Sequence, residues 1–244
     1  MASLSRDSMT LTVLTWLWKQ PQGRTKYTAE HVWIWADMVS RNLGMKHRLA
    51  CVTTETDLPP NVDRIDPPGE FEDVQPKWGP TKPNCFRRLA MFKRDAAKTF
   101  GNRFVSMDLD CVIGGQLDPL FDRPEDLVLF KGTAEGRPYN GSMMLIEAGC
   151  RPQVYESFDQ SGADESGEKF LGSDQAWLAH CLGWGEATWD QRDGVHFFKP
   201  SGWSNKLSPR ILFFPGKRKP WDYAPFKIFP FITNNYRVSE REAA

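Results

Sequence analysis

Asp108 and Asp110 are the residues of this chain whose type and spacing most clearly indicate chemistry. They end an apolar run from Arg103 that is typical of a buried strand. Side chains two positions apart on a strand point to the same side, so both carboxylates can face one cation. Two carboxylates leave most of an octahedral shell to water and to the oxygens of a diphosphate, as Mg²⁺ and Mn²⁺ favour. The pair therefore predicts a divalent-cation site, although aspartates after a strand also occur in simple turns.

Two polar pairs further along the chain could contact a ligand. Asn140 and Gly141 precede an apolar, strand-like run, and by themselves they fit a hairpin turn equally well. Asp174 and Gln175 stand at the start of a predicted helix, where an aspartate can simply complement the helix dipole. A glutamine has no such role there, and its amide can hydrogen-bond to sugar hydroxyls. These four residues are candidates for a polar binding site.

A local basic cluster toward the end of the chain is the candidate anion site. It lies around Gly216 and Pro220, which interrupt regular structure, so its cations occupy a loop that could close on a diphosphate. A solvated surface explains most such clusters. Trp203 and Trp221 lie nearby and offer flat indole faces for a sugar ring or a base. The cluster consists of Lys206, Arg210, Lys217, Arg218 and Lys219.

The composition of the 244 residues fits one large domain, because 40% are hydrophobic and 13% aromatic. Lys and Arg number 31, as do Asp and Glu, so no overall basic field indicates a nucleic acid partner. The five widely spaced cysteines form neither a zinc motif nor a disulfide framework, which indicates a reducing compartment. The apolar run 11–18 is too short to span a bilayer and does not resemble a signal peptide. We expect a cytoplasmic protein without a transmembrane segment, and the oligomeric state stays open.

The start of the chain predicts a β-α-β unit. Residues 10–16 form an apolar strand pattern, and 28–43 form an amphipathic helix capped by Thr28. Residues 47–54 form a second strand pattern. In an open sheet that begins this way, ligands bind at the carboxyl ends of the strands. The loop 20–27 after the first strand is therefore expected to face the site.

The rest of the chain predicts further layers around this sheet. Prolines exclude a regular helix from 57–83, a long loop of the kind that is often functional. Residues 84–100 predict a second helix, with Arg88 beside its apolar face and Arg87 pointing to solvent. A polar, glycine-containing loop that could move is predicted for 161–169. Further strands are predicted at 125–130 and 141–147, and a helix at 173–182.

Taken in order, these motifs resemble the GT-A glycosyltransferases. Within that group they are most similar to the retaining family of glycogenin and the bacterial lipopolysaccharide galactosyl- and glucosyltransferases. The resemblance extends from Thr12 to Trp221, and its order and spacing matter more than any single motif. It is carried by Arg88-Leu89, Asp108-Leu109-Asp110, Tyr139 to Leu145, Asp174-Gln175 and Phe214 to Trp221.

The resemblance implies an α/β fold with one GT-A domain, a Rossmann-like nucleotide-diphospho-sugar transferase domain with a mixed central sheet flanked by helices. Its expected extent is 9–229, with tails at 1–8 and 230–244. It also implies an enzyme that moves a hexose from a nucleotide-diphosphate sugar to an unidentified carbohydrate or other hydroxyl acceptor, with retention of configuration. Mn²⁺ or Mg²⁺ would assist this transfer.

The site residues are carried over from the family motif by motif. Asp108 and Asp110 would hold the metal on the diphosphate, and Asp108 and Arg88 would bind the nucleotide. The donor sugar would be lined by the catalytic candidates Asn140, Asp174 and Gln175. The phosphates would be covered by Gly216, Lys219 and Trp221.

One departure from the family concerns the metal. The family usually has a histidine as third metal ligand shortly before the position of Gly216, and this chain has Phe213 and Phe214 there. The expected shell is therefore two aspartates, diphosphate and water, with Lys217 to Lys219 supplying part of the positive charge. Two other functions fit the motifs as well. One is a phosphohydrolase of the haloacid dehalogenase type, and the other is a non-catalytic binder of sugar nucleotides or glycans.

Overall fold

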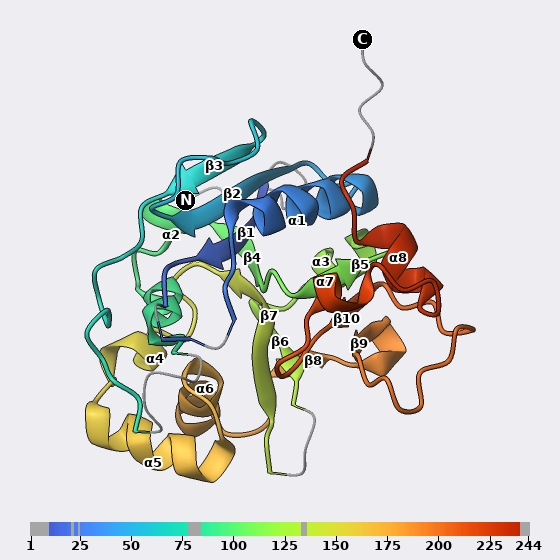
Figure 1. Ribbon diagram of the computed structural model, residues 1–244. Coiled ribbons are helices and arrows are strands. Elements are labelled where there is room, and N and C mark those ends of the chain that lie inside the picture. Colours follow the sequence, from blue (N-terminus) through green and yellow to red (C-terminus); the bar gives the residue numbers. More distant parts are fainter. Residues whose placement is uncertain (1–9, 21, 24, 78–83, 133–135, 240–244) are drawn as a thin grey trace.

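A computed structural model describes residues 10–20, 22–23, 25–77, 84–132 and 136–239 (Figure 1). Its centre is a seven-stranded sheet with the order β3-β2-β1-β4-β7-β6-β8. The sheet is mixed, because β7 runs antiparallel to β4 and β6 while β1 is parallel to both β2 and β4. The strands are β1 (Leu11–Leu17), β2 (His47–Thr53), β3 (Val62–Ile65), β4 (Arg103–Met107), β6 (Leu127–Lys131), β7 (Tyr139–Glu147) and β8 (Ala187–Trp189).

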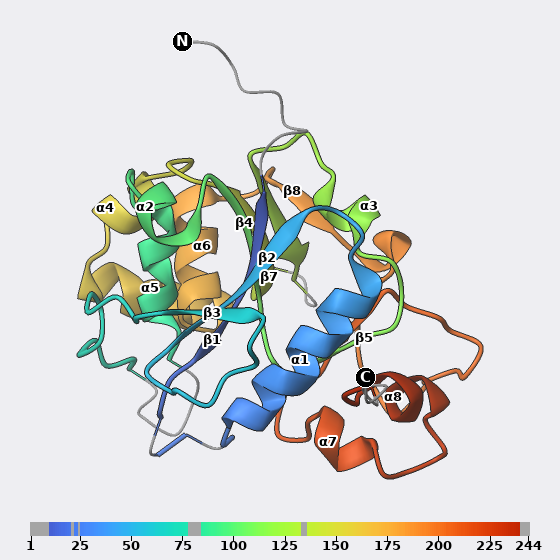
Figure 2. The same ribbon diagram turned by 90° about the horizontal axis from the view of Figure 1, so that it is seen from above.

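Helices cover both faces of this sheet, as Figure 2 shows. All seven residues of β1 are buried, and its side chains alternate between the two cores. Val13 packs in the core under α1, which contains Trp35, whereas Leu14 packs in the opposite core with Trp177 of α6. The first face carries α1 (Ala29–Asn42). The second carries the 3₁₀ helix η2 (Phe86–Phe92), α2 (Ala97–Phe100), α4 (Gln153–Glu156), α5 (Gln160–Phe170) and α6 (Asp174–Leu182).

A small second sheet lies on the α1 side and brings the end of the chain to the aspartate motif. Its order is β5-β10-β9, and β10 is antiparallel to β5. Just beyond β10, the Phe214 amide donates to the carbonyl oxygen of Asp110 at 3.0 Å. The strands are β5 (Cys111–Ile113), β9 (Val195–Phe197) and β10 (Ile211–Phe213). The remaining short helices are α3 (Asp118–Phe121), η3 (Gln191–Asp193), α7 (Pro220–Tyr223) and α8 (Pro230–Asn235).

The predicted β-α-β opening is confirmed, with Thr28 as the N-cap of α1. The predicted helix over 84–100 is wrong in detail. Lys93 adopts an extended conformation (φ −63°, ψ 146°), so the segment divides into η2 and α2. Arg87 does not point freely to solvent either. Its side chain is 14% exposed, and its guanidinium donates to the carbonyl oxygen of Pro68 at 3.1 Å.

Two segments predicted as loops contain regular structure. Residues 161–169 lie within α5, whose N-cap Asp159 accepts a hydrogen bond from the Gly162 amide at 2.8 Å. The buried residues of this helix are Ala163, Ser166 and Gly167, so small side chains replace the apolar stripe that a pattern search requires. The proline-rich segment contains β3, and the prolines at 80 and 83 lie outside the described residues.

The packed part of the chain continues beyond the predicted boundary at 229. The helix α8 occupies 230–235, and its Ile232 is fully buried in the core under α1. Tyr236 follows it and is also buried. The predicted tail at 230–244 therefore begins with a packed helix. The tail at 1–8 lies outside the described residues.

Candidate active site

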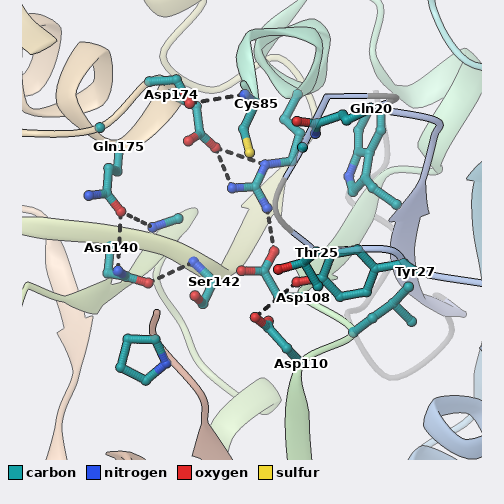
Figure 3. A pocket seen from close by; sticks show the side chains of 18 of the residues that line it. Gln20, Thr25, Tyr27, Cys85, Asp108, Asp110, Asn140, Ser142, Asp174 and Gln175 are labelled. Carbon is teal, nitrogen blue, oxygen red and sulfur yellow. Dashed lines mark hydrogen bonds and ion pairs between the residues drawn. The ribbon is translucent and has the colours of Figure 1, made fainter. Parts of the chain in front are cut away.

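A cavity of about 870 Å³ lies where β1 and β4 end, and the loop 20–27 lines it as expected (Figure 3). It brings together residues from η2, β7, α6 and the segment after β10. Nearly every predicted site residue lines this cavity, namely Arg88, Asp108, Asp110, Asn140, Asp174, Gln175, Gly216 and Lys219. The predicted site residue Trp221 is not among the described residues that line it.

Arg88 lies between two of the three aspartates of the cavity. Its Nε and Nη2 contact one oxygen of Asp174 at 2.8 and 2.5 Å, and its Nη1 donates to Asp108 at 2.6 Å. The side chains of Arg88 and Asp174 are each 5% exposed, whereas that of Asp108 is 30% exposed. The guanidinium is therefore fixed by a buried partner, and Asp108 is the member of this cluster that a ligand can reach most easily.

Two local features hold this ion pair in place. Ser173, the N-cap of α6, accepts a hydrogen bond from the Cys85 amide at 2.9 Å, which joins α6 to the start of η2. Gly141 provides the space: a Cβ there would lie 2.6 Å from Nη2 of Arg88 and 2.9 Å from Asp174. Asn140 and Gly141 lie within β7, not in a hairpin turn. The glycine is needed for this close approach of side chains to the strand.

The amides of Asn140 and Gln175 form a second, neutral part of the site. Asn140 donates to Oε1 of Gln175 at 3.1 Å and accepts from the Ser142 amide at 2.9 Å (Figure 3). Gln175 in turn donates to the carbonyl oxygen of Leu171 at 2.7 Å. These bonds set the orientation of both amides, which can then present oxygen and nitrogen atoms to hydroxyl groups of a ligand.

Asp110 is bound by two residues from distant parts of the chain. The Lys219 ammonium donates to its Oδ2, and the Tyr27 hydroxyl donates to the same oxygen at 3.1 Å. Lys219 is 5% exposed, whereas Lys217 and Arg218 are exposed. The predicted basic cluster is thus divided, and Lys219 alone among these three lines the cavity.

The buried charges shift each other's proton affinity. Burial raises the pKa of the Asp174 carboxyl, while Arg88 acts in the opposite direction. Burial likewise raises the pKa of Asp110 against the effect of Lys219. The pKa of the Tyr27 hydroxyl is raised by burial and by the negative charges of Asp110 and Asp108, so Tyr27 stays a hydrogen-bond donor.

The donor set does not fit a metal ion held by the protein. Asp108 and Asp110 are each bound to an internal cation, and the described residues contain no group of three His, Cys, Asp or Glu that could hold a metal. Phe213, which stands where the family has its histidine, is 1% exposed and packs 5.3 Å from the ring of Phe130 in the core. Because both carboxylates already neutralise Arg88 and Lys219, they offer little free negative charge to Mn²⁺ or Mg²⁺.

The tryptophans and Tyr27 differ from the sequence expectation. The ring of Trp221 packs on the rings of His31 and Tyr27, with centroid distances of 4.1 and 5.7 Å. It therefore supports Tyr27, whose hydroxyl binds Asp110. Trp203 packs on Phe198 and is not among the described residues that line the cavity, so it does not offer its ring to a ligand there. The sequence motifs do not identify Tyr27 as a site residue. Its position in the loop 20–27, which is expected to face the site, is the one sequence feature that points to it.

Solved structures similar to this one include glycosyltransferases. The galactosyltransferase LgtC, in complex with donor and acceptor sugar analogs, superposes with a TM-score of 0.55 at 14% identity, over 94% of this chain and 98% of LgtC. GlyE of Streptococcus pneumoniae TIGR4 gives 0.56 at 15% identity, over 88% of this chain and 57% of GlyE. The bifunctional glycosyltransferase WbbM gives a TM-score of 0.55 at 12% identity, over 96% of this chain and 50% of WbbM. No protein-family model and no curated protein matches the sequence.

The chain therefore has the fold of the GT-A glycosyltransferases, as the motif resemblance implies. At these identities the likeness shows the fold, and the function is argued from the site. Within the described ranges, no helix has both the length and the apolar character needed to cross a bilayer.

Proposed function

We propose that this protein is a glycosyltransferase that moves a hexose from a nucleotide-diphosphate sugar to a carbohydrate or other hydroxyl acceptor, with retention of configuration. The observation that carries the proposal is the convergence of Arg88, Lys219 and the Asn140–Gln175 amide pair on one cavity at the strand ends of this fold. Its volume of about 870 Å³ lies in the range of small-molecule sites.

The charge of the cavity suits a diphosphate. Among the described residues, five basic side chains line it against three aspartates, an excess of two positive charges, whereas the formal net charge of the whole chain is zero. Transfer places growing negative charge on the departing diphosphate, which fixed cations stabilise. The basic residues are Lys19, Lys26, Arg88, Arg137 and Lys219.

The uncharged part of the cavity suits the rest of the donor. The amide pair can bind sugar hydroxyls, and Leu17 and Trp18 provide apolar surface for a base. Asp174 acts through Arg88 as a positioning residue, because its carboxylate is buried against the guanidinium. The expected Mn²⁺ or Mg²⁺ is no part of this proposal, since the residues present do not fit it.

The site does not fit a phosphohydrolase of the haloacid dehalogenase type. Its nucleophilic aspartate must be free to attack phosphorus, and here the two aspartates of the motif are bound to Arg88 and Lys219. A non-catalytic binder of sugar nucleotides would also fit this cavity, and the experiment below distinguishes it from an enzyme.

The test is a panel of UDP-, GDP-, ADP- and dTDP-hexoses, measured by thermal shift and by release of the nucleoside diphosphate in the presence of simple sugars as acceptors. We expect one donor to raise the melting temperature and to be turned over. Gln175→Ala should slow turnover strongly, whereas the matched Gln191→Ala, at an exposed position outside the cavity, should not. Stabilisation without release would identify a binder, and no response to any donor would refute the proposal.

A further inference from the structure

The position of Lys219 sets it apart from its basic neighbours. Its ammonium donates to Asp110 and, at 3.1 Å, to the carbonyl oxygen of Phe214, and the residue is 5% exposed although it lines the cavity. Lys217 and Arg218, which share the loop, are exposed. Burying an unpaired ammonium costs on the order of several kcal/mol, as for other buried ions. Its placement therefore requires a specific set of partners.

The fold provides those partners from both sides of the loop. Pairing of β10 with β5 places Phe214 beside Asp110, whose backbone oxygen accepts the Phe214 amide. Gly216, with φ +89°, turns the chain back. Lys219 then caps α7, and its amide donates to Asp222 at 2.7 Å. The backbone on both sides of the loop is thus fixed, and it holds the Lys219 ammonium against Asp110 and Phe214.

This ammonium is bound to the carboxylate that the motif assigns to a metal. An ammonium has three N–H donors, of which the oxygens of Asp110 and Phe214 use two. Because Lys219 lines the cavity, the third can serve a phosphate oxygen. The lysine belongs to the family motif, and the histidine is the departure. Without that metal ligand, Lys219 is bound to Asp110 and supplies a fixed positive charge there.

We infer that the Lys219 ammonium takes the place of the divalent cation, so that this site binds a nucleoside diphosphate and releases it from the sugar without added metal. The inference rests on the proposed function. In the transfer, the bond between the anomeric carbon and the diphosphate oxygen breaks, and its electron pair stays on that oxygen beside Lys219. The acceptor oxygen forms the new bond to the anomeric carbon, and its proton passes to the departing diphosphate.

Calorimetric titration of UDP, GDP, ADP and dTDP tests this inference, each in excess EDTA and in excess Mn²⁺. For the wild-type protein we expect the best ligand to bind with the same affinity, within about threefold, under both conditions. Lys219→Ala should weaken binding about tenfold to hundredfold in EDTA, the range for a lost hydrogen bond to a charged group. Mn²⁺ should restore much of that loss, because the variant frees Asp110 for the metal. Lys217→Ala is the matched control and should bind as the wild type does.

The outcomes separate the two claims. Binding by the wild-type protein in Mn²⁺ but not in EDTA would overturn the inference and leave the proposed function standing. Absence of binding by every nucleotide under both conditions would overturn both. Lys219→Met combined with Asp110→Asn, which leaves no unpaired buried charge, should bind weakly in EDTA and in Mn²⁺ alike. Rescue of that double variant by Mn²⁺ would also contradict the inference.

Discussion

Replacing Arg88 with methionine leaves the carboxylate of Asp174 buried without its guanidinium partner. The side chain of Asp174 is 5% exposed, so water cannot replace the lost contacts. Breaking a buried ion pair in this way costs about 3–5 kcal/mol of unfolding free energy. Asp108 adds little, since its side chain is 30% exposed and can be hydrated. For a chain of this length the loss corresponds to a melting temperature lower by about 6–20 °C.

Urea unfolding followed by circular dichroism measures this loss, and Arg87→Met is the matched control. Arg87 is the neighbour in sequence and has no buried counter-ion, because Glu72, 3.5 Å away, is 58% exposed. Its substitution removes a hydrogen bond to the carbonyl oxygen of Pro68, so we expect a loss of about 1–2 kcal/mol, clearly below that of Arg88→Met. The deficit of Arg88→Met should shrink as pH falls. Without the guanidinium, burial raises the pKa of Asp174 further above its value in the unfolded chain. The protonated carboxyl is therefore compatible with the fold at low pH, and stability is lost as pH rises through the folded pKa of Asp174.

The double variant of Arg88→Met with Asp174→Asn decides whether charge is the cause. Asparagine keeps the shape of the side chain and removes its charge, so the double variant should be more stable than Arg88→Met alone. If the two substitutions instead lower the stability additively, or if Arg87→Met is as damaging as Arg88→Met, the guanidinium does not act as the buried counter-ion described above.

Two further predictions concern a glycine and a thiol. Gly141→Ala should destabilise the protein by about 1–3 kcal/mol, because its Cβ would lie 2.6 Å from Arg88, whereas Gly69→Ala, with nothing within 4 Å, should stay within about 0.5 kcal/mol in urea unfolding. Equal effects would show that the space beside Gly141 is not limiting. Burial raises the pKa of the Cys181 thiol to about 11 from 9.0, so at mildly alkaline pH its thiolate fraction falls about a hundredfold. Iodoacetamide labelling of the native protein, read by mass spectrometry, should therefore be slower by at least that factor than labelling of the unfolded chain, and similar rates would contradict the shift.

The elements that could be predicted from the sequence are those with long, regular patterns. The strand and helix that open the chain show clear periodicity and a capping residue, and β4 is an apolar run that ends at the aspartate motif. The helix α5 was missed because Ala163, Ser166 and Gly167 form its buried face, and small or polar residues carry no hydrophobic signal. The strands β8, β9 and β10 have three residues each, too few for any period to show.

The candidate site divides in the same way. Local motifs predicted most of the polar side chains that line the cavity, including Asp108, Asp110, Asn140 and Gln175, but they wrongly included Trp221 and missed Tyr27. They were not sufficient to predict which charges pair. Lys219 and Asp110 are 109 residues apart, and their contact depends on the pairing of β10 with β5, which involves strands too short to predict.

Stability alone does not account for the ion pairs of the cavity. Buried ion pairs can often be replaced by apolar residues without loss of stability, because desolvation offsets much of their attraction. Here, however, Arg88 and Lys219 hold the three described aspartates of the cavity, at the strand ends of a GT-A fold. Groups fixed in this way need little reorganisation when charge develops on a ligand. The same contacts that make Arg88 and Lys219 expensive to bury give the cavity two cations already in position for a diphosphate.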